Sequence, residues 1–414
     1  MRNKKLKIAI TGATGLLGRN LLFEIIKQNL DRLDSLEIIA LGRNKNSADI
    51  QHRIRDIILN DGLSYFSDDK SAVARIKDYC ATGIKTVYAD LDKDKLGLDR
   101  GDFNRLKEPA IDFFFHLAAL TDLRYTPVVE EALRRTNIEG TRQILHLVSA
   151  LNVREFCYTG TAYSCGSISG KVKPDYINVS GKFRNPYEKT KLESEMLVRN
   201  FCKKSKIRHR CFRPSVMCGR LIESPIGAVN KFDVFYGWAA FFFQIKLKNL
   251  LKGRDIYKEP LNLDLRICYS SKSGLNIVPA DYAAKVMYQV CVQGHPDESY
   301  YLVNNRETSH SVYIPLMLKA LNITGPRQVD CIPTQMNPLE RIYYKTAGRV
   351  FTSYITLDPI LFDTGNLNGV LRKAKLRCPP VDKNTFPLLM NYAKKHGFGL
   401  NRKNGFAAVK AESK

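Results

Sequence analysis

The stretch Thr11-Gly12-Ala13-Thr14-Gly15-Leu16-Leu17-Gly18 lies between an apolar segment at residues 5–11 and a segment at 19–30 whose leucines and isoleucines recur at helical spacing. This arrangement predicts a buried strand, a turn and a helix. Three glycines at this spacing permit a tight turn, close approach of the backbone to a pyrophosphate, and close packing of the helix on the strand. The first N–H groups of the helix are free to bind phosphates. We therefore predict a dinucleotide site at Thr11, Gly12, Thr14, Gly15, Leu16, Leu17 and Gly18.

The rest of the first half of the chain alternates between strands and helices. Further strands are predicted at 37–41, 84–89, 111–116 and 153–159, and a helix is predicted at 139–150. Such alternation implies a parallel sheet that is covered by helices on both faces. We expect an α/β fold, namely a Rossmann-type doubly wound parallel sheet with a smaller, mainly C-terminal substrate-binding lobe.

The regular alternation ends at Pro214, and we place a domain boundary there. The nucleotide-binding domain is expected at 1–215, with 275–305 returning to it. The substrate-binding lobe is expected to comprise 216–274 and 306–400. The polar residues 401–414 are expected to form a flexible tail.

The composition predicts a soluble protein of a reducing compartment. The chain has 414 residues, of which 44% are hydrophobic and 26% charged. Its apolar runs fall short of the roughly 20 residues that span a bilayer. Its ten cysteines are scattered singly and do not show metal-ligand spacing, so we expect free thiols and no metal site. We therefore expect a cytoplasmic protein.

The formal net charge of +24 predicts an anionic ligand or partner. The chain carries no nucleic-acid-binding motif, so we expect no nucleic-acid partner. Residues 232–254 combine aromatic and basic side chains. This segment is either a buried helix of the lobe, or a lid whose basic end receives coenzyme A, an acidic carrier protein or a membrane surface. The sequence gives no indication of the oligomeric state.

The end of the second predicted strand favours NADP(H) as the cofactor. A cofactor without the 2′-phosphate usually meets an acidic residue at this position. Arg43 stands there instead, and its guanidinium group suits a phosphate.

A tyrosine and a lysine predict acid–base chemistry. Tyr187 and Lys191 lie four residues apart after Pro186 and therefore share one face of a predicted helix. We expect the ammonium group to lower the pKa of the phenol, so that Tyr187 can exchange a proton. Thr161, which follows a strand end, is our candidate for a third catalytic hydroxyl, with Ser164 as the alternative.

Asn137 is a fourth candidate for the catalytic group. It could hold a backbone carbonyl or a water molecule in a proton relay, or it could cap a helix.

Together, the glycine motif, His116-Leu-Ala-Ala119, Asn137-x-x-Gly-Thr141, Tyr187-x-x-x-Lys191 and Arg213-Pro-Ser215 resemble the extended short-chain dehydrogenases/reductases. Two further stretches resemble the thioester reductase and fatty acyl-CoA reductase branch of that family. They are Asp90-Leu91 followed by Leu96-Gly97-Leu98, and Gly160-Thr161-Ala162-Tyr163, in which Gly160 replaces a serine.

The resemblance implies an NADPH-dependent reduction of an acyl thioester, carried by coenzyme A or an acidic carrier protein, to an aldehyde or onward to an alcohol. Thr161 and Tyr187 would bind the oxyanion, and Lys191 would hold the cofactor ribose. Asp90 would lie near the adenine and Pro214 near the nicotinamide. Further cofactor contacts are implied for Leu91, Ala118, Ser215 and Val216. The alternative is another activity of the extended family, such as a nucleotide-sugar epimerase or dehydratase, or a hydroxysteroid-type dehydrogenase.

Overall fold

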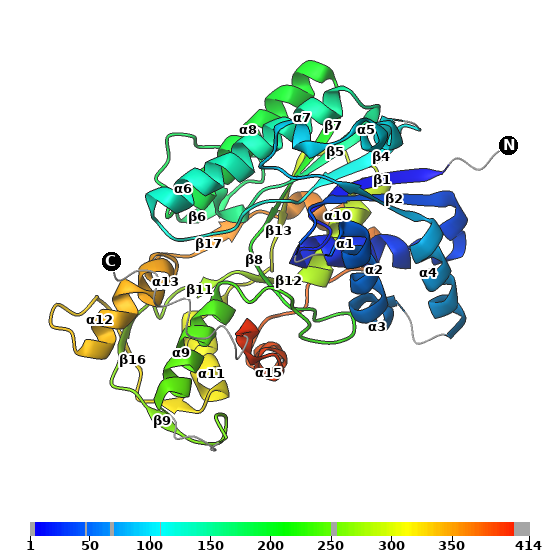
Figure 1. Cartoon of the computed structure of the whole chain (residues 1–414). Helices are drawn as coiled ribbons and strands as arrows, with labels where there is room; N and C mark the ends of the chain where they lie inside the picture. Colours follow the sequence, from blue (N-terminus) through cyan, green and yellow to red (C-terminus); the bar gives the residue numbers. More distant parts are fainter. Residues whose placement is uncertain (1–4, 46–47, 67–69, 108, 250–254, 401–414) are drawn as a thin grey trace.

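A seven-stranded, entirely parallel sheet forms the centre of the computed structural model, which describes residues 5–45, 48–66, 70–107, 109–249 and 255–400 (Figure 1). The strand order is β13-β7-β5-β4-β1-β2-β3. The order reverses between β1 and β4, and in such sheets ligands bind outside the carboxyl ends of the strands at this point. The strands are β1 (Leu6–Thr11), β2 (Leu36–Gly42), β3 (Ile84–Tyr88), β4 (Ile111–His116), β5 (Val153–Thr159), β7 (Arg208–Pro214) and β13 (Ser299–Leu302).

Helices cover both faces of the sheet, as Figure 1 shows. Residues Ile8 and Ile10 of β1 join one core with α1 (Leu16–Lys27) and α10 (Ala280–Val292). Ala9, between them, joins a second core with α7 (Gly140–Ser149) and α8 (Pro186–Ser205). Successive side chains of a strand point to opposite faces, so both faces of β1 are apolar. The predicted doubly wound α/β fold is confirmed.

The predicted strands at 111–116 and 153–159 coincide with β4 and β5. Strand β13 was not predicted from the sequence, because its four residues are all buried and show no alternation of polar and apolar side chains. The remaining helices of this part are α2 (Ile50–Asp56), α3 (Leu63–Phe66), α4 (Lys70–Thr82), α5 (Arg100–Lys107) and α6 (Pro127–Leu133).

A second lobe packs beside the sheet and has its own core (Figure 1). Its helices are α9 (Phe235–Asn249), α11 (His310–Ala320), α12 (Pro338–Lys345), α13 (Ala347–Ile355) and α15 (Phe386–Lys395). Its short strands are β9 (Leu261–Asn262), β10 (Arg266–Cys268), β11 (Gly274–Leu275), β14 (Thr308–Ser309), β15 (Ile323–Thr324) and β16 (Arg327–Val329). Of the helices that the structure describes, none combines the length and the apolar character that a bilayer span requires.

The chain crosses between the two parts more than once. Strand β12 (Ile277–Pro279) pairs with β8 (Val216–Cys218), and α10 then packs on α1. Two elements of the segment 306–400 also contact the first part of the molecule. Strand β17 (Ile360–Phe362) pairs with β6 (Gly170–Val172), and α14 (Asn368–Lys373) packs on α10. The predicted tail, 401–414, lies outside the described residues.

Helix α9 is a core helix, and the interpretation of residues 232–254 as a lid is wrong for this helix. The Trp238 ring stacks on those of Tyr343 and Phe351, with centroids 6.4 and 5.5 Å apart. The Lys246 side chain is fully buried and donates a hydrogen bond to the Leu321 carbonyl. A helix that is apolar around most of its circumference belongs inside the protein. Residues 250–254 lie outside the described part of the chain.

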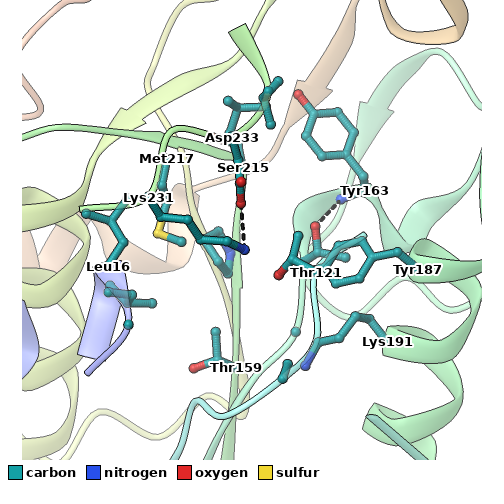
Figure 2. A pocket seen from close by; sticks show the side chains of 18 of the residues that line it. Leu16, Thr121, Thr159, Tyr163, Tyr187, Lys191, Ser215, Met217, Lys231 and Asp233 are labelled. Atoms are coloured by element: carbon teal, nitrogen blue, oxygen red, sulfur yellow. Dashed lines mark hydrogen bonds and ion pairs between the residues drawn. The ribbon is translucent and has the colours of Figure 1, made fainter. Parts of the chain in front are cut away.

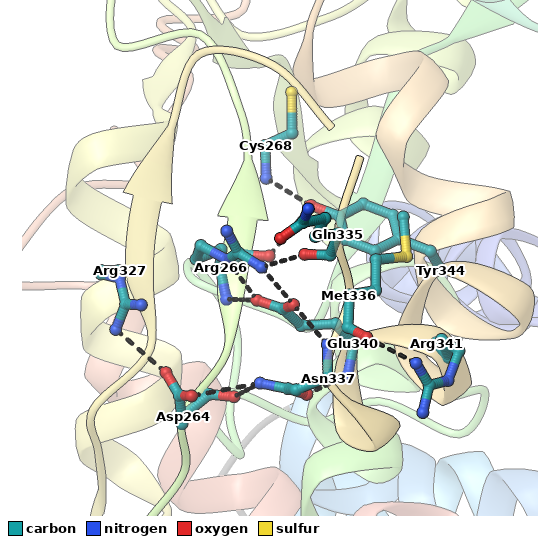
Figure 3. A network of polar contacts seen from close by, with 10 residues as sticks. All are labelled: Asp264, Arg266, Cys268, Arg327, Gln335, Met336, Asn337, Glu340, Arg341 and Tyr344. Atoms are coloured by element: carbon teal, nitrogen blue, oxygen red, sulfur yellow. Dashed lines mark hydrogen bonds and ion pairs between the residues drawn. The ribbon is translucent and has the colours of Figure 1, made fainter. Parts of the chain in front are cut away.

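A polar network joins α12 to the strands of the lobe (Figure 3). The buried Glu340 carboxylate accepts hydrogen bonds from Nε and Nη2 of Arg266, at 2.6 and 2.7 Å. Glu340 also closes a capping box with Asn337 at the start of α12. These bonds favour the charged form, so the Arg266 guanidinium holds the pKa of Glu340 at about 2.

Glu340→Gln is expected to destabilise the protein by about 1–3 kcal/mol at pH 7, because it removes the carboxylate that accepts hydrogen bonds from Arg266. The depressed pKa of Glu340 means that its contribution is complete above pH ~5 and is lost as the pH falls toward 2. Urea unfolding of wild type and variant at pH 7, 5 and 3.5 measures this. The difference should shrink as the pH falls, and a constant difference would contradict the assignment.

Candidate active site

A cavity of about 330 Å³ opens at the carboxyl ends of β1, β4, β5 and β7. Figure 2 shows Tyr187 and Lys191 along one side of it and Leu16 and Met217 on the opposite side. The predicted site residues that line it are Gly12, Gly15, Leu16, Leu17, Gly18, Thr161, Tyr187, Lys191, Pro214, Ser215 and Val216. The other predicted site residues do not line it, namely Thr11, Thr14, Arg43, Asp90, Leu91, Ala118 and Asn137.

The glycine loop requires glycine for steric reasons. Gly12 has a φ of +75°, and a Cβ atom there would lie 2.7 Å from the backbone nitrogen of Ala118. A Cβ atom on Gly18 would lie 2.1 Å from the carbonyl oxygen of Gly12. Gly15 is the N-cap residue of α1, so the helix begins at the cavity wall. The loop therefore brings free N–H groups and the positive end of a helix dipole to the cavity.

Thr11 and Ala118 hold this loop to the end of β4. The Thr11 hydroxyl accepts a hydrogen bond from the Ala118 nitrogen at 3.2 Å and contacts His116 Nδ1 at 2.8 Å. His116 Nε2 in turn contacts the Thr141 hydroxyl at 3.1 Å. These residues fix the position of the glycine loop on the sheet.

Two arginines rather than one lie near the end of β2, because Arg53 of α2 contacts Arg43. Arg43 is 63% exposed, and its guanidinium group lies 3.9 Å from the carboxylates of Asp90 and Asp92. Arg53 of α2 donates a hydrogen bond to the Thr14 hydroxyl at 3.2 Å and another to the Arg43 carbonyl. Burial, and then the charge of Arg43, lower the pKa of Arg53. Arg43 and Arg53 therefore form a pair of neighbouring cations, with the carboxylates of Asp90 and Asp92 beside Arg43. Sequence reasoning missed Arg53, because an arginine on a surface helix carries no motif.

Leu91 and Ser215 have structural partners. Leu91 packs against Gly140, where a Cβ atom would lie 2.7 Å from the leucine side chain. The Ser215 hydroxyl donates to the Asn276 side chain at 2.7 Å, and the Val216 nitrogen donates to the Asn276 carbonyl at 3.2 Å. Asn276 thus holds the segment after β7 against the cavity.

Helix α8 positions Tyr187 and Lys191. The helix begins at Pro186, where the Asn185 side chain caps it by accepting the Glu188 N–H. Lys191 Nζ lies 4.4 Å from the centre of the Tyr158 ring, and burial lowers the pKa of Lys191 to about 7.

The expected lowering of the Tyr187 pKa is not found. Burial raises the pKa of Tyr187 to about 12, an effect that a hydrogen bond with Thr121 only partly offsets. The reason is that removing the phenolate from water outweighs the available stabilising contacts. Tyr187 is therefore a protonated hydrogen-bond donor at neutral pH.

Of the two candidates for the third hydroxyl, Thr161 lines the cavity and Ser164 does not. The Thr161 hydroxyl accepts a hydrogen bond from the Tyr163 nitrogen at 3.3 Å. The Ser164 hydroxyl is committed to the Thr161 carbonyl at 2.8 Å. Thr159, which sequence reasoning missed, also lines the cavity, and its buried hydroxyl has no hydrogen-bond partner.

Asn137 positions the loop that follows β4. It lies within a π-helical turn, η4 (Arg134–Glu139), and is not a helix cap. Its side chain accepts from the Leu120 nitrogen at 2.8 Å and donates to the Leu120 carbonyl at 3.0 Å. This places Thr121 of the same loop beside Tyr187.

Loops and the second lobe supply cavity residues that the sequence did not indicate. Lys231 and Asp233, which form an ion pair at 2.6 Å, come from the segment before α9. Glu188 and Tyr354 complete the wall near Tyr187. These residues carry no motif, because only the tertiary fold brings them to the site.

All ten cysteines are free thiols. Ligand atoms of Glu155, Cys157 and Cys291 lie within 4.8 Å of one another. However, Glu155 pairs with the buried Arg210, and burial raises the pKa of the Cys157 thiol. The ion pair occupies the carboxylate, and burial opposes the thiolate that a metal would require.

A glycine loop at the β1–α1 turn and a Tyr–Lys pair at the same switch point define an NAD(P)-dependent oxidoreductase of the extended short-chain dehydrogenase/reductase type. The chain belongs to the male sterility protein family, whose model matches residues 10–287.

Similar proteins include synthetases and reductases. A linear gramicidin synthase of Brevibacillus parabrevis is 21% identical over 402 residues, which are 94% of this chain and 7% of that protein. Human fatty acyl-CoA reductase 2 is 28% identical over 162 residues, which are 38% of this chain and 28% of that protein. The chain therefore matches only a small part of the length of these two relatives. The terminal R domain of the myxalamid PKS-NRPS pathway has a similar structure, with a TM-score of 0.67, 21% identity, and coverage of 96% of this chain and 92% of that one.

Lys191→Met is expected to stabilise the protein at neutral pH and raise its melting temperature by a few degrees. Burial depresses the pKa of Lys191 to about 7, so the folded state releases a proton that the unfolded state keeps up to pH ~10.4. The loss of folding stability caused by burying Lys191 is therefore greatest below pH 7 and disappears as the pH rises to ~10.4. Thermal unfolding at pH 6.5 and pH 10 measures it. A methionine variant that is less stable than wild type at both values would show that the ammonium has a stabilising partner.

Proposed function

We propose that this protein reduces an acyl thioester to an aldehyde with NADPH. The observation that carries the proposal is the placement of Tyr187, Thr161 and Lys191 in one cavity next to the glycine loop. The membership of the male sterility protein family and the similarity to a fatty acyl-CoA reductase support it. The aldehyde could be reduced in the same site to an alcohol.

The residues of the cavity suit NADP(H), which would supply a hydride to the substrate carbonyl. Gly12 and Gly18 allow backbone approach, and Arg43 with Arg53 provides a place for the 2′-phosphate. Lys191 and the unpartnered hydroxyl of Thr159 would bind the nicotinamide ribose. We assign further contacts to Thr11, Thr14, Gly15, Leu16, Leu17, Asp90, Leu91, Ala118, Pro214, Ser215 and Val216.

Tyr187 and Thr161 would donate hydrogen bonds to the carbonyl oxygen as negative charge develops on it, and Tyr187 would deliver the proton. Tyr187 is protonated at neutral pH, as an acid must be before the reaction, although its raised pKa makes it a weaker acid than a free tyrosine. Asn137 acts through the loop that carries Thr121 and is a positioning residue. The thiol then leaves as the hemithioacetal collapses.

The thiol would be coenzyme A or the arm of an acidic carrier protein, and the net charge of +24 would attract either one. We propose that 1–215 with 275–305 binds NADP(H), and that 216–274 with 306–400 binds the substrate. The free cysteines suit a reducing compartment such as the cytoplasm.

Wild type should oxidise NADPH in the presence of acyl-CoA or acyl-carrier thioesters and release an aldehyde or alcohol that mass spectrometry identifies. Tyr187→Phe should lose at least about 100-fold in kcat, because it removes the proton donor. NADPH affinity and melting temperature should stay close to wild type. A variant with near-normal turnover would rule out Tyr187 as the acid. Activity on nucleotide sugars but on no thioester would overturn the proposal itself.

Arg43→Ala is expected to weaken NADPH binding by about 1.5–3 kcal/mol, because a charge-assisted hydrogen bond to the 2′-phosphate is lost. NADH binding should change little. Arg53→Ala should act in the same direction, and Arg55→Ala, an exposed arginine of the same helix, is the matched control. Fluorescence titration gives the dissociation constants. Equal losses for both cofactors would show that Arg43 does not bind the phosphate.

A further inference from the structure

We infer that the inner end of the cavity is closed by a fixed wall, which makes the protein selective for acyl groups of a few carbons over long chains. This inference rests on the proposed thioester reduction and adds its substrate class. The wall consists of Tyr163, Tyr354 and Glu188, with Arg184 behind them.

Three parts of the chain build this wall. Tyr163 comes from the 3₁₀ turn η5 (Ala162–Cys165), Glu188 from the first turn of α8, and Tyr354 from α13 of the second lobe. All three line the cavity. The two tyrosine rings meet edge to face with centroids 5.6 Å apart, so they close the space between η5 and α13. Figure 2 shows Tyr163 on the same side of the site as Tyr187.

A buried ion pair supports the two rings from behind. The Arg184 guanidinium lies 5.5 Å from the centre of the Tyr163 ring and 5.3 Å from that of Tyr354. Its Nη1 donates to both carboxylate oxygens of Glu188, at 3.1 Å each. The Arg184 and Glu188 side chains are 2% and 0% exposed. Water cannot replace these partners, so disrupting the pair would strand a buried charge.

Tyr354 is held at both sides of its hydroxyl group. The hydroxyl donates to Glu188 at 2.7 Å and accepts from the Asn185 amide at 2.6 Å. Swinging the ring aside would break both bonds inside the protein, where unmade hydrogen bonds are costly. On the other side, the Phe362 ring packs edge to face on Tyr163 at 5.9 Å. An acyl chain therefore cannot lengthen inward without dismantling this cluster.

The volume and the entrance of the cavity also indicate a short acyl group. About 330 Å³ is near the lower end of the range for ligand pockets, and the nicotinamide must share this space. Lys231 and Asp233 line the cavity and have side chains that are 46% and 45% exposed, so they mark its open side. The pantetheine arm must reach a bulky carrier outside and would leave here. The acyl group then points toward the wall.

The first test is a series of acetyl-, butyryl-, octanoyl- and palmitoyl-CoA with NADPH and the wild-type protein. We expect kcat/KM to fall at least about tenfold from butyryl- to palmitoyl-CoA, as clashes with a fixed wall produce. Palmitoyl-CoA reduced as efficiently as butyryl-CoA would overturn this inference and leave the proposed function intact. Reduction of no thioester at all would overturn both.

The second test enlarges the wall at one point. Tyr354→Ala should raise the palmitoyl-to-butyryl ratio of kcat/KM about tenfold. Tyr257→Ala removes a half-buried tyrosine of the same lobe that does not line the cavity, so it should keep the wild-type ratio. Tyr354→Phe keeps the ring but loses the two hydrogen bonds that hold it, so its ratio should lie between those of wild type and Tyr354→Ala. If Tyr354→Ala melts below the assay temperature, Tyr163→Ala opens the wall from its other side. An unchanged ratio in the folded wall variants would show that the wall does not limit the chain.

Discussion

The contact between Gly12 and the end of β4 sets the geometry of the whole site. The backbone of the glycine loop lies so close to Ala118 that even a methyl group would not fit. Below this contact, Thr11, His116 and Thr141 form a chain of buried hydrogen bonds. Burial, and then the charge of Lys191, lower the pKa of His116 to about 3, so this imidazole is neutral and does not add a second positive charge beneath the lysine.

Around α8, the exclusion of water shifts the pKa values of two residues in opposite directions. The sheet and its helices exclude water from Lys191 and Tyr187, which shifts the pKa of the lysine down and that of the tyrosine up. Both shifts reflect the same physical cause, because burial disfavours whichever form is charged. The burial of Lys191 costs stability that a hydrophobic residue would not cost, and in the mechanism proposed above it also strengthens hydrogen bonds to the charge that develops on the substrate.

The sequence was informative wherever function depends on local geometry. The glycine spacing, the Tyr–Lys spacing and the strands β4 and β5 were all predicted, since each follows from the conformation of a few consecutive residues. The walls of the cavity could not be predicted in this way. Tyr354 and Lys231 reach the site through the packing of the second lobe, and the pKa of Tyr187 depends on burial that has no signature in its neighbours. The lid interpretation of helix α9 was wrong for a related reason. Lys246 lies in a basic run, which suggests an exposed side chain, but tertiary packing buries it.

The return of the chain to the sheet constrains how the molecule is made. Strand β13, at residues 299–302, covers the edge of β7, and α10 covers α1, yet both follow the first half of the second lobe in the sequence. During synthesis the sheet therefore emerges with an unpaired edge at β7 and with part of its apolar face uncovered, a state that invites association with other chains. The two parts of the molecule cannot mature one after the other, and completion of the half that contains the parallel sheet must wait until the ribosome has passed residue 302.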